Sequence, residues 1–155
     1  MPDQTTSDSE ERGPLDVLLV EDDAGDVIIA QEALRAGQVD TRLSIVSDGV
    51  EAMAFLHREG EYRDAERPDL ILLDLNLPRK SGHEVLAEVK ADPALRSIPV
   101  VVLTTSAAVE DVARSYEQYA NVYVTKPVDF DHFTAVVKQI DSFFSEVARL
   151  PPQAD

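Results

Sequence analysis

The sequence of 155 residues contains no cysteine and no tryptophan, and it lacks any long apolar run. The absence of cysteine excludes disulfide bonds and thiolate metal sites. Apolar runs such as residues 100–103 are far too short to span a bilayer. Residues 1–13 are polar and acidic, the opposite of a secretory signal peptide. The sequence therefore predicts a cytoplasmic protein with no membrane segment.

Basic residues are also scarce, and lysine is scarcest. Thirty acidic residues face 14 basic ones, of which four are lysine, and the formal net charge is −16. Such a charge opposes binding to nucleic acid or to anionic membranes, because both depend on Lys and Arg meeting phosphates. We therefore expect neither partner. Two origins of the acidic, lysine-poor surface stay open: adaptation to high salt, and ordinary acidic composition.

Short apolar runs alternate five times with helical patterns. The predicted strands are residues 15–20, 42–46, 69–73, 100–103 and 121–124. The predicted helices are residues 24–36, 49–59, 82–91, 108–119 and 129–149. Three of the strands are continuous apolar runs, which is typical of parallel strands buried on both faces. The pattern predicts one α/β domain over residues 15–150, a doubly wound parallel sheet of five strands, between flexible tails 1–14 and 151–155.

Polar side chains follow four of these strands. In open α/β sheets, ligands bind beyond the carboxyl ends of the strands. The residues expected at that edge are Glu21, Asp22 and Asp23 after the first strand, Asp74 after the third, Thr104, Thr105 and Ser106 after the fourth, and Lys126 after the fifth. The sequence thus predicts that acids, hydroxyls and one ammonium group converge at one edge of the sheet.

Carboxylates gathered at one edge repel each other, by about 4 kcal/mol for two charges 4 Å apart at an effective dielectric of 20. A cation would relieve this repulsion, and an all-oxygen cluster open to water suits Mg²⁺. A carboxylate beside a divalent cation and a lysine can attack a phosphoryl group, while a hydroxyl holds one of its oxygens. For Asp22 or Asp23 taken alone, a role as loop residue or helix cap is the simpler interpretation.

Four motifs in order resemble the receiver domains of response regulators. They are Val-Glu-Asp-Asp at 20–23, Leu-Leu-Asp-Leu-Asn-Leu-Pro at 72–78, Leu-Thr-Thr at 103–105 and Tyr-Val-Thr-Lys-Pro at 123–127. The spacing between them also matches the family pattern. The resemblance covers residues 15 to about 144, and it implies a flavodoxin-like (βα)5 fold and a two-component signalling function.

The resemblance implies roles for the acidic residues. Asp74 corresponds to the phospho-acceptor, which receives its phosphoryl group from a histidine kinase. Asp22 corresponds to a direct Mg²⁺ ligand, Glu21 to a water-mediated one, and the backbone carbonyl of Asn76 to a further ligand. Asp23 falls one position past the metal pair and is left out.

The other implied roles belong to the last two strands. Thr104 corresponds to the switch hydroxyl, and it alone has the family spacing, which disfavours Thr105 and Ser106. Lys126 corresponds to the cation that contacts the phosphoryl group. Tyr123 corresponds to the aromatic residue whose rotamer follows Thr104.

The C-terminal third resembles the single-domain response regulators of bacterial phytochromes. The resemblance rests on residues 102–106, on the pattern Tyr-x-x-x-x-Asn-x-Tyr at 116–123, and on the ending 143–151. It implies a phytochrome-type sensor histidine kinase as the partner. Two positions depart from the receiver pattern: Ser81 stands where Asp is common, and His83, which we interpret as an exposed residue at a helix start, follows Gly82.

The last predicted helix carries more apolar surface than one sheet face requires. Its stripe consists of Phe130, Phe133, Val137, Ile140, Phe144 and Val147, widened by Val136 and Phe143. Part of this stripe covers the sheet. The surplus near residues 143 and 144 predicts a homodimer through helix 108–119, strand 121–124 and helix 129–149.

Three other protein classes fit the sequence less well. A small Mg²⁺-dependent phosphatase also uses an Asp nucleophile after a strand, but it needs a second acid two residues on, where this chain has Asn76. A flavin-binding electron carrier needs a phosphate loop rich in Ser, Thr and Gly, where this chain has Glu-Asp-Asp. A transcription factor is disfavoured by the negative charge and by the end of the sequence at Asp155. We therefore expect a non-enzymatic phospho-acceptor domain.

The charge of −16 predicts a stability that depends on salt. Screening weakens the repulsion among surface carboxylates, so the melting temperature should rise as NaCl is increased from about 0.05 M to about 1 M. Differential scanning calorimetry at constant pH measures this. A flat profile would contradict adaptation to high salt.

Overall fold

A computed structural model describes residues 13–36, 40–75, 77–104, 122–125 and the single positions 131, 135, 138, 139 and 142. Its sheet is parallel, with strand order β2-β1-β3-β4-β5. The strands are β1 (Leu15–Val20), β2 (Thr41–Val46), β3 (Leu70–Asp74), β4 (Val100–Thr104) and β5 (Val122–Thr125). The predicted α/β class with a parallel sheet is confirmed.

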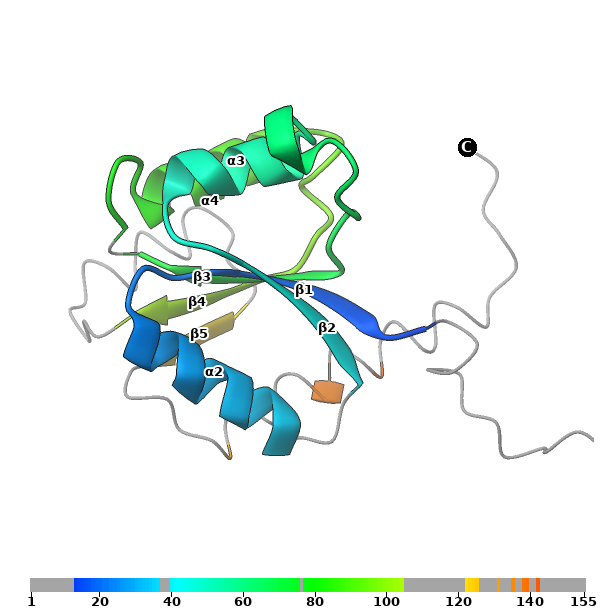
Figure 1. Ribbon diagram of the computed structural model, residues 1–155, viewed down its shortest axis with the longest axis vertical. Coiled ribbons are helices and arrows are strands. Elements are labelled where there is room, and N and C mark those ends of the chain that lie inside the picture. Colours follow the sequence, from blue (N-terminus) through cyan, green and yellow to red (C-terminus); the bar gives the residue numbers. More distant parts are fainter. Residues whose placement is uncertain are drawn as a thin grey trace, which may run out of the picture.

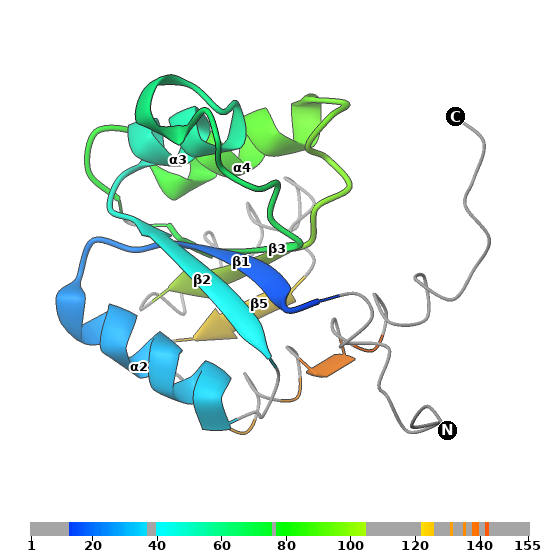
Figure 2. The same cartoon turned by 45° about the vertical axis from the view of Figure 1, so that its right-hand side comes forward.

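The described helices cover both faces of this sheet. Helix α2 (Ala24–Ala36) lies on one face, and α3 (Gly49–Leu56) and α4 (Gly82–Ala91) lie together on the other (Figures 1 and 2). A short 3-10 helix, η1 (Gly60–Tyr62), follows α3. Strands and helices alternate from β1 to β4, so the right-handed crossovers of a doubly wound sheet explain why the helices divide between the two faces.

The core consists of two clusters separated by the sheet. Alternate residues of β1 and β3 point to opposite faces, as the twofold period of a strand requires. The cluster under α3 and α4 includes Leu18, Val20, Ile71 and Leu73, and the cluster under α2 includes Val17, Leu19, Leu70 and Leu72. Since all eight side chains are buried, the continuous apolar runs correspond to strands with two buried faces.

Element boundaries differ from the predicted ones by a few residues. Strand β3 is shifted by one residue, so Asp74 is its last residue rather than the residue after it, and Thr104 likewise ends β4. Helix α3 ends at Leu56 and not at 59, because Arg58 adopts a left-handed backbone conformation with φ of 55°. The amides of residues 58 and 59 then bond to the carbonyls of 55 and 54, which is a Schellman motif.

The C-terminal predictions lie mostly outside the described residues. The whole of the predicted helix 108–119 lies outside the described residues. Of the predicted helix 129–149, the described positions 131, 135, 138, 139 and 142 are helical and exposed. Their spacing places them on one face of a helix. The apolar stripe and the predicted dimer surface are not described. In the part of the chain that is described, no helix is both long and apolar enough to cross a membrane.

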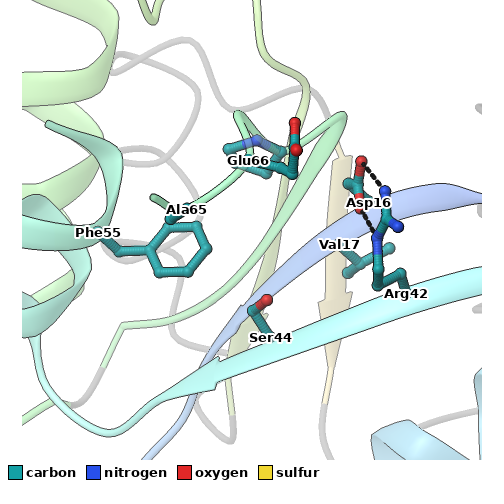
Figure 3. A pocket seen from close by; sticks show the side chains of 8 residues that line it. Asp16, Val17, Arg42, Ser44, Phe55, Ala65 and Glu66 are labelled. Carbon is teal, nitrogen blue, oxygen red and sulfur yellow. Dashed lines mark hydrogen bonds and ion pairs between the residues drawn. The ribbon is translucent and has the colours of Figure 1, made fainter. Parts of the chain in front are cut away.

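An ion pair lies at the amino end of the sheet. The Arg42 guanidinium donates to both carboxylate oxygens of Asp16, over 2.6 and 3.2 Å, beside a cavity of about 110 Å³ (Figure 3). The hydrogen bond and the charge of Asp16 raise the pKa of Arg42. Because both residues lie at the starts of their strands, this cavity is at the opposite end of the sheet from Glu21 and Asp74.

Helix α4 begins directly against the end of β3. A β-carbon at Gly82 would lie 2.2 Å from the carbonyl oxygen of Asp74 and 2.6 Å from the Cα of Leu75. Both neighbours are backbone atoms, which cannot rotate away as a side chain would. Only glycine therefore fits at the first residue of α4.

We expect Gly82→Ala to lower the free energy of unfolding by about 1–3 kcal/mol, as overpacking of a tight contact does. Gly25→Ala is the matched control, because Gly25 also lies in a first helical turn but meets only the side chain of Asp23, at 3.2 Å. It should change stability by no more than about 0.5 kcal/mol. Urea unfolding in EDTA measures the stability of both variants. Equal unfolding midpoints for the two variants would contradict the close contact at Gly82.

Candidate metal centre

Three carboxylates meet at the carboxyl edge of the sheet. Oxygen atoms of Glu21, Asp22 and Asp74 all lie within 4.8 Å of one another. Glu21 and Asp22 follow β1, and Asp74 ends the neighbouring strand β3. Glu21 and Asp74 are buried, whereas Asp22 is exposed. The edge predicted from the carboxyl ends of the parallel strands thus gathers the acids predicted to be there.

The loop after β1 is fixed by local hydrogen bonds. The amide of Glu21 donates to the carbonyl of Val46 over 3.0 Å, and the amide of Asp23 donates to Oε2 of Glu21 over 3.2 Å. The Asp23 carboxylate accepts from the amides of Gly25 and Asp26, over 2.8 and 3.4 Å. Asp23 therefore caps the start of α2, a role consistent with leaving it out of the metal site.

Asp74 lies at the junction of three strands. Its own strand pairs with β1, and Asp74 itself is in register with Leu103 of β4. The amide of Leu75 donates to the carbonyl of Leu103 over 3.3 Å. The amide of Gly82 donates to the carbonyl of Leu75 over 3.1 Å, so the loop 75–82 closes on itself directly after Asp74.

The tip of this loop contacts α3. Arg79 donates from Nη1 to Oδ2 of Asp48 over 3.1 Å, while Oδ1 of Asp48 accepts from the amide of Glu51 over 2.8 Å and caps α3. A β-carbon at Gly49 would lie 2.1 Å from the carbonyl oxygen of Lys80, so the loop backbone touches the helix start. The sequence analysis missed this contact, and no motif in it indicated that Asp48 and Arg79 would meet.

The ion pair of Arg79 adds no net stability to the fold. Its side chain is 60% exposed, and ion pairs of such exposed groups contribute about 0–1 kcal/mol. Its backbone φ is +66°, and a left-handed conformation costs a residue other than glycine roughly 1–2 kcal/mol. The ion pair therefore at most offsets the cost of the backbone conformation.

The donor set fits a divalent cation. Each pair of carboxylates at this separation repels by on the order of 3 kcal/mol at an effective dielectric of 20. Burial of Glu21 and Asp74 keeps water from screening that repulsion fully. Three carboxylates at the ends of two strands, one of them exposed to water, suit Mg²⁺ or Mn²⁺, which take oxygen ligands and keep several waters.

The remaining predicted site residues are placed only in part. Thr104 ends β4 beside β3, and Tyr123 lies in β5 in register with Val102, so both strands reach the edge where Asp74 lies. Asn76, Lys126, Thr105 and Ser106 fall outside the described residues.

The two positions that depart from the receiver pattern lie at the start of α4. Ser81 caps α4 through a reciprocal pair of hydrogen bonds with Glu84, which explains why a serine serves at this position. His83 lies in the first turn of α4, as predicted, but it is half-buried rather than exposed.

These observations define a class: an α/β protein whose parallel sheet carries an acidic cation site at its carboxyl edge. The sequence matches the response regulator receiver domain over residues 17–138. The chain therefore belongs to the response regulator receiver domain family.

Two relatives match nearly the whole chain. Response regulator Rcp1 of Synechocystis sp. is 49% identical over 142 residues, which are 92% of this chain and 97% of that protein. The crystal structure of the Mn²⁺-bound form of Rcp1 superposes with a TM-score of 0.74 at 50% identity, covering 90% of this chain and 100% of that one. The phosphorylated cyanobacterial phytochrome response regulator RcpA gives a TM-score of 0.75 at 48% identity, with coverage of 90% and 100%.

We expect Asp22→Asn to raise the dissociation constant for Mn²⁺ by about tenfold or more, because one unit of charge is lost from a small ligand set. Without metal, the same variant should melt no lower than the wild type, since its repulsion with Glu21 and Asp74 is removed. Isothermal titration calorimetry and thermal melts in EDTA measure the two effects.

Asp23→Asn is the matched control for Asp22→Asn. It removes the same charge one residue further along and keeps an oxygen acceptor for the cap of α2. Its Mn²⁺ affinity should stay within about threefold of the wild type, as expected for a screened charge outside the cluster. Equal losses of Mn²⁺ affinity in the two variants would show that the net negative charge of the loop, and not ligation by Asp22, governs binding.

Proposed function

We propose that the chain accepts a phosphoryl group on Asp74 from a histidine kinase, with Mg²⁺ bound, and signals through a changed protein-contact surface. The observation that carries this proposal is the position of the Asp74 carboxylate, buried at a strand end within reach of Glu21 and Asp22. The Mn²⁺-bound form of Rcp1 and the phosphorylated form of RcpA support it among the relatives.

The proposed reaction is a transfer between two side chains. A carboxylate oxygen of Asp74 forms a bond to phosphorus, the bond from phosphorus to the imidazole nitrogen of the kinase histidine breaks, and the imidazole keeps the electron pair. Bound Mg²⁺ would neutralise charge on the phosphoryl oxygens. Glu21, Asp22 and the backbone carbonyl of Asn76 would hold the ion. The product is an acyl phosphate that water hydrolyses slowly, so the domain carries a signal and does not turn over a substrate.

The proposed response involves the neighbouring strands. Lys126 would contact a phosphoryl oxygen with its ammonium group, and the hydroxyl of Thr104 would bind another. Movement of Thr104 toward the phosphoryl group would free space for Tyr123 to change rotamer. Because β4 and β5 are adjacent, this change would reach the outer face of β5.

The proposed partners are proteins. A phytochrome-type histidine kinase is the expected donor, as the similarity to RcpA suggests. A second copy of the chain is the expected contact for the surface of helix 108–119, β5 and helix 129–149, and phosphorylation would shift that dimer only by its different affinity for the two states. We propose neither nucleic acid nor a membrane as a partner, because the net charge of −16 opposes binding to phosphate-rich surfaces. We place the receiver domain at residues 15–150, between tails 1–14 and 151–155, in the cytoplasm.

Asp74→Asn should abolish labelling by acetyl phosphate in the presence of Mg²⁺, because the amide is not a nucleophile. The variant should still fold, since losing one charge of the cluster relieves repulsion. Intact-protein mass spectrometry would show the added phosphoryl group in the wild type, and peptide mapping after borohydride reduction would locate it. Asp23→Asn should still be labelled. A phosphoryl group found on Glu21 or Asp22 of Asp74→Asn would contradict the assignment.

A further inference from the structure

Three carboxylates are buried among the described residues: Glu21, Asp74 and Asp48. The first two belong to the metal cluster, but Asp48 begins α3 and takes no part in it. Its two oxygens have separate partners, the amide of Glu51 and the guanidinium of Arg79. The cap alone would need one oxygen, so the second serves the contact with the loop 75–82.

Arg79 occupies a position that its own backbone disfavours. Its φ of +66° suits glycine or asparagine better than arginine. Strain of this kind gathers near functional sites, where surrounding contacts hold it in place. Since the ion pair at most offsets the strain, the stability of the fold does not explain why an arginine stands here.

The loop is held at two separate places. At its base, the amide of Gly82 bonds to the carbonyl of Leu75, directly after Asp74. At its tip, Arg79 bonds to Asp48, and the backbone of Lys80 touches Gly49. Leu75, directly after Asp74, and Lys80, beside Arg79, are therefore each held against neighbouring backbone.

We propose that Arg79 is a positioning residue for the cation site. Its ion pair with Asp48 holds the loop 75–82 against α3 and so fixes the backbone beside Asp74 in the conformation that binds a divalent cation. This inference rests on the proposed function for its setting, and it concerns a residue that touches neither the cation nor the phosphoryl group.

The direction in which the cation affinity changes distinguishes positioning by Arg79 from simple electrostatics. Removing the positive charge of Arg79 would by long-range attraction favour a cation, and removing the negative charge of Asp48 would disfavour it. If Arg79 acts by position, both Arg79→Asn and Asp48→Asn weaken cation binding. Asparagine suits both places, because it tolerates a positive φ at 79 and caps a helix as well as Asp at 48.

The test measures the affinity of the full chain for Mn²⁺ by isothermal titration calorimetry at about 0.15 M salt. We expect each variant to raise the dissociation constant about tenfold, the lower end of what loss of a partner behind metal ligands causes. The double variant should be no weaker than either single one, because both remove the same contact. Arg79→Lys, which keeps the charge, should recover part of the affinity.

Arg58→Asn is the matched control. Arg58 also has a positive φ, of 55°, but it lies at the other end of α3, so its substitution should leave Mn²⁺ affinity unchanged. In EDTA, Arg79→Asn and Arg58→Asn should unfold at similar denaturant concentrations. A much lower midpoint for Arg79→Asn would make Arg79 a structural residue and overturn the proposal.

Other outcomes are equally decisive. Mn²⁺ affinity in Arg79→Asn that equals or exceeds that of the wild type would overturn the positioning role, as would a wild type that binds no divalent cation. Labelling of Asp74 is a separate readout. If the wild type binds Mn²⁺ but takes no phosphoryl group on Asp74, the proposed function fails, and the affinities of the variants still decide the role of Arg79.

Discussion

Mutual repulsion of carboxylates at the carboxyl edge of the sheet is the constraint on which the site depends. Glu21 and Asp74 are buried side by side with Asp22 at the rim, an arrangement that is costly unless positive charge is supplied. A bound divalent cation would relieve this cost. The fold must hold the acids together against their repulsion, and the surrounding structure is organised to do so.

The sheet supplies the rigidity that this arrangement needs. Glu21 and Asp22 follow β1, and Asp74 ends β3. Both strands have two buried faces and are held by core packing on either side. The loops that leave these strands are short and closed by hydrogen bonds: Asp23 caps α2, and Gly82 returns the second loop to Leu75. The acids therefore sit at fixed ends of rigid strands and not on free loops.

The elements of this fold could be predicted closely where periodicity and helix caps agree. Strand 15–20 and helices 24–36 and 82–91 matched to the residue, because apolar runs end there at acids or capping residues. Helix α3 was predicted three residues too long, since nothing in the sequence marks Arg58 as left-handed.

The meeting of Glu21, Asp22 and Asp74 could be predicted from their places at the carboxyl ends of parallel strands, whereas the contact of Asp48 with Arg79 could not. That contact joins residues 31 apart in sequence and depends on where a loop tip reaches in space. The roles of Thr104, Lys126 and Tyr123 came from the family resemblance, and they stay predictions.

The division of the core into two clusters has a consequence for how such a protein can change during evolution. Alternate residues of β1 and β3 belong to different clusters, so a substitution at Leu18 affects packing under α3 and α4, and one at Leu19 affects packing under α2. Substitutions in separate clusters share few neighbours, and their effects on stability are expected to add. One helical layer can therefore be repacked for a new binding partner while the other layer, and the strand ends between them, stay as they are.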